Sequence, residues 1–415
     1  RLLDPAVMRD TFQQTQGIKS FYDFRDIDVD RYEIDGRTTQ VVLAARELKQ
    51  TDLPNSSWES EHIAFTHGYG IAAAPANAID ANGRPDYALA DIPVAARSGA
   101  DSLEVDMPGL YIGEGLQGYA IVGATRDEVD FQDNDDRTEV TRYDGADGVE
   151  INSLPRKLAF ALRFAEPNLV VSGELGSDSR ILYKRDVVDR AKTLAPFLKF
   201  DSDPYPAVID GKVMWILDAY TSTDMFPYAE RVNPRAVRKG DLRSSVNYVR
   251  NSIKVVVDAY DGTPNFYVVD DADPIAKSYQ RQFPNLFSEE TPSTELTEHF
   301  RYPEDLFRMQ TEMWGRYRIT EASEFYDAAG AWSVAQDPGN SIGQTAVESV
   351  IDASGNIISS SEVRIAPQYL LMRLPGDEDA AFVIFRPFGP LGPLGRLRIP
   401  WSPDNPEILS LIHIS

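Results

Sequence analysis

A chain of 415 residues is long enough for more than one hydrophobic core, because single cores stop growing at roughly 250–300 residues. The net charge of −24 opposes binding to nucleic acid or to anionic lipid headgroups, and the absence of cysteine excludes disulfides, thiolate zinc sites and a cysteine nucleophile. The sequence contains no run of the roughly 20 apolar residues that span a bilayer. It begins with Arg1 and shows no signal-peptide pattern, so we expect a piece of a longer protein.

The first part of the chain predicts a short helix followed by strands. Residues 5–20 place apolar side chains at helical spacing. Residues 32–48 predict two strands joined by a turn at Asp35 and Gly36. Residues 75–125 carry short β-rich runs between prolines and glycines, which indicates strands joined by loops.

A charged segment and two amphipathic helices follow. Residues 126–148 are dominated by Asp, Glu, Arg and Gly, and we expect a solvated loop there. Helices are predicted at 155–165 and at 185–198. The first of them carries four apolar side chains on one face: Leu158, Ala161, Leu162 and Ala165.

Residues 195–232 combine aromatic side chains with turn signals. Asp210 and Gly211 predict a hairpin turn, and the apolar run that follows predicts a buried strand containing Trp215. We therefore expect Trp215 and Tyr220 to be packed in the interior.

The remaining part of the chain predicts one more hairpin, two helices and several short strands. Residues 253–270 predict a hairpin with its turn at Asp261 and Gly262. Helices are expected at 272–286 and 303–318, and short strands and loops at 319–388.

This order of elements predicts an α+β fold with mixed, mostly antiparallel sheets, several amphipathic helices and two subdomains. We expect a β-rich subdomain at 1–150 and an α+β subdomain at 151–388, which contains the block 195–232. Residues 389–415 show neither helical nor strand periodicity, and we interpret them as a linker or a foreign tail.

The segment from Gly339 to Gly343 matches the Gly-x-Ser-x-Gly pattern of a nucleophile elbow. An elbow requires an apolar strand directly before its serine, whereas the residues before Ser341 form a turn. The only histidine downstream is His413, in the expected tail. The pattern therefore does not support a catalytic Ser341.

Asp26, Asp28 and Asp30 alternate along the chain, as do the first ligands of a calcium loop. The rest of that loop is missing, because Arg31 stands where glycine is required and Arg37 where a bidentate glutamate should be. These three residues are candidate ligands for a structural calcium ion, the one cofactor that the sequence suggests. The alternative interpretation is a solvated strand with three outward aspartates.

His67 lies between aromatic residues and next to Gly68, with Gly70 two residues beyond. The glycines permit unusual backbone angles that would direct the imidazole into a cleft, and we expect both to resist substitution. Asp201 and Asp203 are candidate partners that would orient His67 or bind a metal. A buried, hydrogen-bonded histidine and turn-capping aspartates are the alternative interpretations.

Several phrases of this sequence resemble one family, the bacterial uncharacterised protein family 0182. They occur in the family's order and include 22–24 with 28–32, 45–48, 66–70, 179–185, 195–198, 203–205, 215–221 and 299–303. The resemblance extends over roughly residues 1–387. It brings no established activity and no catalytic residues.

The resemblance implies a polytopic membrane protein with several spanning helices upstream of a large extracytoplasmic region, which this chain would form. We expect it to act as a binding or channel-covering module with an envelope or protein partner, attached to the cell membrane through those upstream helices. The alternative is an envelope-acting hydrolase that uses His67 with Asp201 or Asp203.

Overall fold

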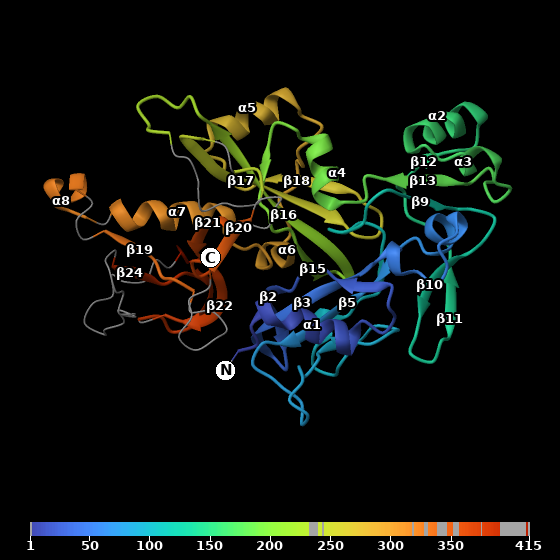
Figure 1. Cartoon of the computed structure of the whole chain (residues 1–415), viewed down its shortest axis with the longest axis horizontal. Helices are drawn as coiled ribbons and strands as arrows, with labels where there is room; N and C mark the ends of the chain where they lie inside the picture. Colours follow the sequence, from blue (N-terminus) through green and yellow to red (C-terminus); the bar gives the residue numbers. More distant parts are fainter. Residues whose placement is uncertain are drawn as a thin grey trace. The chain divides into compact units, whose positions relative to one another are not determined.

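The computed structural model describes residues 2–231, 240–242, 245–317, 319–327, 331–337, 347–351, 357–374, 376–390 and 412–413. Helices and antiparallel sheets occur together along these residues, which confirms the predicted α+β class (Figure 1). The chain divides into two compact units, of which the first contains Arg1–Thr223 and Tyr248–Phe300 and the second Asp224–Asn247 and Arg301–Ser415. The subdomain boundary that we expected at residue 150 falls inside the first unit.

The first sheet of unit 1 follows α1 (Pro5–Gln16), whose N-terminus is capped by the Asp4 carboxylate at 3.0 Å from the Ala6 amide. Its strands run in the order β1-β3-β5-β6-β7, with β2 also paired to β3. The predicted hairpin at 32–48 is confirmed, because Asp35 and Gly36 both adopt positive φ between β2 and β3. The strands are β1 (Tyr22–Phe24), β2 (Asp28–Ile34), β3 (Arg37–Leu48), β5 (Ile71–Pro75), β6 (Leu89–Ala90) and β7 (Ala95–Ala96).

The second sheet of unit 1 contains two hairpins whose inner strands pair with each other. Both predicted turns are present, with Gly211 and Gly262 at positive φ. Trp215 and Tyr220 are buried in the central strand, as predicted, and the Trp215 indole Nε1 donates to the Ile112 carbonyl at 2.9 Å. The strands are β14 (Lys199–Phe200), β15 (Tyr205–Ile209), β16 (Lys212–Thr223), β17 (Tyr248–Asp258) and β18 (Pro264–Val268).

One hydrophobic core joins the two large sheets. It contains Leu43 of β3, Trp215 of β16 and Val255 of β17, together with Val187 and Ala191 of α4. Figure 1 shows α4 and α5 beside the second sheet. The helices in this part of unit 1 are α4 (Val187–Leu194), α5 (Pro274–Gln282) and α6 (Thr294–Glu298).

A smaller sheet in the order β12-β13-β9 packs against the predicted helix at 155–165. The helix is present as α2, but only Ala161 of its predicted apolar face packs against the core, together with Phe160 and Phe164, whereas Leu158 and Leu162 are exposed. The elements are β9 (Tyr119–Val122), β12 (Val149–Glu150), β13 (Arg180–Tyr183), α2 (Leu154–Phe164) and α3 (Asn168–Val171).

The prediction of a solvated loop at 126–148 is wrong for two parts of that segment, which form strands. β10 (Glu128–Gln132) pairs β11 (Thr138–Thr141), and Phe131 and Glu128 are buried. The density of charge concealed the strands, because the two buried residues are three positions apart across a β-bulge and give no period-two pattern. The short connecting elements of unit 1 are β4 (Gly68–Tyr69), which pairs β8 (Gly109–Leu110), and η1 (Gln50–Asp52), η2 (Ser60–Ala64) and η3 (Asp101–Leu103).

The part of unit 2 that starts at Arg301 contains the predicted helix at 303–318, which is α7, followed by a short helix and by short strands as expected. Leu306 and Met309 of α7 are buried. Part of the expected tail belongs to strands, since β24 includes Gly389 and β25 pairs with β23. Ser341, the serine of the Gly-x-Ser-x-Gly pattern, lies outside the described residues. The elements are α7 (Glu304–Tyr317), α8 (Ala322–Asp327), β19 (Trp332–Val334), β20 (Val347–Ile351), β21 (Ile357–Glu362), β22 (Gln368–Arg373), β23 (Ala380–Phe385), β24 (Phe388–Pro390) and β25 (Ile412–His413).

Candidate functional site

His67 lies in the interior of unit 1, directly before β4. Its Nδ1 is 2.9 Å from the Gly68 carbonyl oxygen, and its ring packs against Tyr111 with 4.5 Å between ring centroids. Burial lowers the pKa of His67 to about 4. The imidazole is therefore neutral at physiological pH and is not displayed in an open cleft.

The two glycines near His67 are constrained for different reasons. Gly70 adopts a φ of +68°, as expected for a residue that must turn sharply. Gly68 has no positive φ, but a Cβ there would lie 2.3 Å from the Arg46 carbonyl oxygen on β3. Close approach of a neighbouring strand, and not backbone angle, thus requires glycine at 68.

Glu128 is the acceptor at the centre of the polar cluster around His67. Tyr111 Oη donates to its Oε2 at 2.9 Å, Thr66 Oγ1 donates to the same oxygen, and the Tyr143 amide donates to Oε1 at 3.1 Å. Burial raises the pKa of Glu128 despite these three donors. Three segments separated along the chain are joined by this one carboxyl group.

Arg185 completes the cluster as a fully buried guanidinium. Its Nε donates to the Tyr111 carbonyl at 3.0 Å and its Nη2 donates to the Thr66 carbonyl. Burial lowers its pKa to about 10, so the group still carries its charge at neutral pH. Two atoms of the cluster, Arg185 Nη1 and His67 Nε2, are buried without a hydrogen-bond partner among the described residues.

These contacts define what the His67 cluster (Thr66, His67, Tyr111, Glu128 and Arg185) can do chemically. The charged and polar groups bind backbone carbonyls and one another, which holds together the loop before β4, the residue after β8, the start of β10 and the loop after β13. A general base needs a proton to accept within hydrogen-bond reach, and the described part of the chain provides no hydroxyl or thiol nucleophile at His67 Nε2. The hydrogen bonds of the cluster thus hold backbone segments from different parts of unit 1 together.

Sequence reasoning found His67 but missed Glu128 and Arg185. The charged segment predicts a solvated loop around Glu128, whereas Glu128 begins a strand. Arg185 ends the phrase 179–185 and begins the helix predicted at 185–198, and neither feature predicts its burial. Its burial follows from tertiary contacts with residues more than 70 positions away, which no local pattern reveals.

Asp201 and Asp203 do not hydrogen-bond His67 in the described structure. Asp201 Oδ1 accepts from the Asp203 amide at 3.1 Å, and its Oδ2 accepts from the Tyr220 hydroxyl. The first contact is a turn cap of the kind proposed as the alternative interpretation, and the second fixes the turn to β16.

The three aspartates near the start of β2 lie in different surroundings. Asp30 is buried and its Oδ2 is 2.7 Å from His299 Nδ1. Asp28 is buried as well, so the interpretation of three outward aspartates is wrong for both residues. Asp26 accepts from the Ile27 amide at 2.7 Å.

Two of these aspartates lie near Glu114 and Asp203. Burial, together with the charges of Asp28, Glu47, Asp203 and Asp26, raises the pKa of Glu114 well above its usual range. Glu47 itself accepts from the Glu114 amide at 2.6 Å and from the Gly115 amide at 2.7 Å. Within the residues that the structure describes, no group of three or more acidic or histidine side chains is arranged to hold a metal ion.

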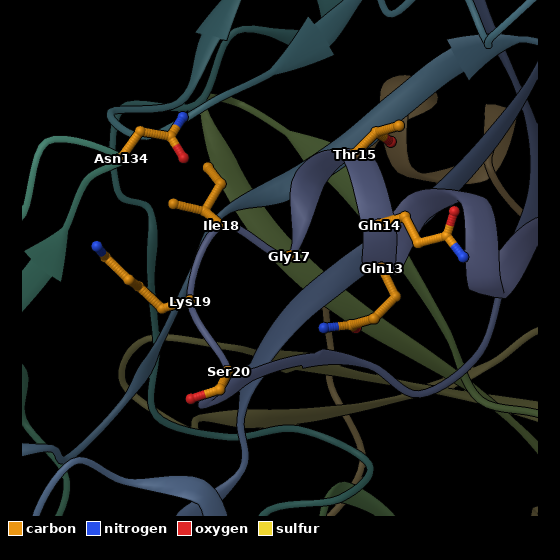
Figure 2. A pocket seen from close by; sticks show the side chains of 8 residues that line it. All are labelled: Gln13, Gln14, Thr15, Gly17, Ile18, Lys19, Ser20 and Asn134. Atoms are coloured by element: carbon orange, nitrogen blue, oxygen red, sulfur yellow. The ribbon is translucent and has the colours of Figure 1, made fainter.

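A polar pocket of about 310 Å³ lies elsewhere in unit 1 and contains none of the residues singled out above. Figure 2 shows that seven of its lining residues come from the end of α1 and the loop after it, and that Asn134 of the β10–β11 turn faces them. Gln13 is engaged with the backbone of Tyr22 and Phe24, and Lys19 pairs with Asp136. The lining is thus largely committed to internal contacts.

Fold and cluster together define an α+β protein with a buried polar centre. The family model described as "Uncharacterised protein family (UPF0182)" matches residues 1–396. Relatives called "UPF0182 protein" are 40% identical over 393 residues in Moorella thermoacetica, 39% over 393 residues in Methanospirillum hungatei and 37% over 399 residues in Trichodesmium erythraeum. The chain belongs to this uncharacterised family, as its phrases indicated.

The alignments cover 93–94% of this chain but only 40–41% of these three relatives, so the chain spans about two fifths of their length. No solved structure matches it. Among the described residues, none of the helices combines the length and apolar character that crossing a membrane requires.

Proposed function

We propose that this chain is the extracytoplasmic part of a multi-span envelope protein, in which it acts as a binding or channel-covering module and not as a hydrolase. The observation that carries the non-catalytic assignment is the state of His67. Its ring is buried, its Nδ1 is engaged with Gly68, and its Nε2 has no hydroxyl or thiol partner among the described residues. Asp201, its candidate partner, is occupied by Tyr220.

The membrane attachment is supported by the family resemblance and by length. Relatives extend well beyond the part matched here, which leaves room for the spanning helices that the resemblance implies. The partner would then be another envelope component or the protein's own membrane part.

Chemical modification of histidine tests the non-catalytic assignment. Diethyl pyrocarbonate should modify the half-buried His62 faster than His67 in the native chain, with rates at each site followed by mass spectrometry. His62 is the internal control because it has the same chemistry in the same unit. If His67 reacts at least as fast as His62, it lies in an accessible cleft and the hydrolase becomes the better hypothesis.

Cysteine labelling tests the proposed location, because this region contains no native cysteine. Ile79→Cys, at a side chain that is 62% exposed, should react with a membrane-impermeant maleimide when the full-length protein is made in intact cells. Val41→Cys, at a fully buried position of the same unit, should react only after denaturation. Labelling of Ile79→Cys only after the membrane is permeabilised would place the region in the cytoplasm.

A further inference from the structure

Helix α2 is apolar on two sides. Phe160, Ala161 and Phe164 pack against the core of the small sheet, while Leu154, Leu158 and Leu162 are 60%, 45% and 83% exposed. Residues four apart on a helix lie about 40° apart around its axis, so these three leucines form a stripe about 12 Å long. We call it the leucine stripe.

The leucine stripe is not an isolated exposed side chain. α3 packs on α2 and also exposes an aliphatic side chain, Val171, by 74%. Figure 1 shows α2 and α3 together beside the small sheet. Scattered exposed apolar residues need no explanation, but an aligned set on one helix face indicates a contact with another apolar body.

The charges of α2 distinguish it from the rest of the chain. The helix contains Arg156, Lys157 and Arg163 and no acidic residue. Counting Glu150 and Glu166 at its two ends, residues 150–166 carry three positive and two negative charges, a net of +1, whereas the whole chain carries −24. Arg156 pairs with Glu150 at 3.3 Å, but both side chains are more than half exposed, and such a pair is weak.

We propose that α2 lies on the surface of a lipid bilayer that contains anionic headgroups, with the leucine stripe among the acyl chains. A helix with leucines on one side and basic residues on its other sides has the amphipathic pattern of interfacial helices. Within the protein, Lys157 donates to the Leu175 carbonyl at 3.2 Å and Arg163 lies over the Phe164 and Tyr183 rings. Charge complementarity selects this occupant, because a basic helix on an acidic protein has its attractive partner in an anionic surface. Charges farther away than about 8 Å are screened at physiological salt, so the net −24 opposes this local contact only weakly.

Vesicle binding by the 415-residue chain tests the proposal. The chain should float with vesicles of equal phosphatidylcholine and phosphatidylglycerol at 0.15 M salt. It should bind pure phosphatidylcholine vesicles less well, since each basic residue near an anionic surface contributes about fivefold. The double variant Leu158→Gln/Leu162→Gln should lower the partition coefficient by about tenfold or more, because two aliphatic side chains no longer enter the apolar phase.

Two controls separate lipid binding from misfolding. Glutamine preserves helix propensity at exposed positions, so the double variant should keep its melting temperature. Ile79→Gln, which also removes an exposed aliphatic side chain but outside α2, should leave vesicle binding unchanged.

Three results would overturn the proposal: no binding to either vesicle, equal binding by the double variant, or dimers in solution that the double variant abolishes. The last result would identify a second copy of the chain as the occupant of the leucine stripe. The proposal does not depend on which side of the membrane the region lies.

Discussion

The pH dependence of stability should reveal the buried state of His67. Histidine in the unfolded chain titrates near pH 6.5, whereas burial lowers the pKa of His67 in the fold to about 4. Between these values the unfolded chain binds more protons, so stability rises with pH. The contribution is fully present above pH 6.5 and is lost as the pH falls toward 4. The difference between the two pKa values corresponds to about 3 kcal/mol in the free energy of unfolding.

Urea unfolding at several pH values measures this contribution. The sequence has a pI near 4.6, where solubility is lowest, so the useful range ends near pH 5. Down to that pH, the same two pKa values predict a loss of about 2 kcal/mol in the free energy of unfolding. The His67→Gln variant cannot bind this proton, and the wild-type minus variant difference should therefore fall by about 2 kcal/mol between pH 7.5 and pH 5.

Subtracting the stability of His67→Gln from that of the wild type removes the contribution of the other titrating groups. Burial raises the pKa of Glu47 and Glu128, so their contribution is lost as the pH rises, opposite in sign to that of His67. Both carboxyl groups are present in wild type and variant and largely cancel in the difference. A difference that does not change with pH would refute the buried, neutral His67, as would an NMR titration of its ring near pH 6.5.

Three further predictions concern stability. Trp215→Ala should cost about 3–5 kcal/mol in urea melts as a truncation in the core, and an unchanged melt would contradict the buried strand. Gly68→Ala should lower the free energy of unfolding more than Gly70→Ala, because only the former forces two backbones apart. Gly36→Ala is the control, since Gly36 has a positive φ and open space and its substitution measures the cost of the backbone angle alone. A loss of stability in Gly68→Ala no larger than that in Gly36→Ala would contradict the steric argument. Calcium, as expected from Asp26, Asp28 and Asp30 in the sequence, should raise the melting temperature more than sodium chloride at matched ionic strength. Equal shifts with both salts would remove a specific site and would agree with the lack of a metal-holding group among the described residues.

The hairpins were predictable because their turns carry a local signature. Asp35, Gly36, Asp210, Gly211 and Gly262 all adopt the positive φ that Asp-Gly pairs tolerate, and the flanking apolar runs are strands. The charged segment before residue 148 was not predictable in this way. Its strands are short, rich in charged residues and mostly half-buried, so only the two buried residues of β10 distinguish them from a loop.

The polar cluster could be predicted only in its first member. His67 attracts attention through its neighbours in the sequence, but Thr66 meets Glu128 across 62 residues and Arg185 across 119. Such pairs are set by the sheets that bring distant loops together. The sequence suggested Asp201 and Asp203 as partners of His67, whereas the fold places His67 against the Gly68 carbonyl and the Tyr111 ring.

Helix α2 shows what periodicity can and cannot decide. The spacing correctly places Leu158 and Leu162 on one face, but a second apolar face, with Phe160 and Phe164, is present on the same helix. Aromatic side chains bury more area than leucine, so burial of the phenylalanine face releases more free energy and the leucines are left exposed. Three aligned leucines expose apolar surface to water, which is unfavourable unless a second apolar surface covers them. The basic residues of α2 favour an anionic bilayer as that surface, as we propose above.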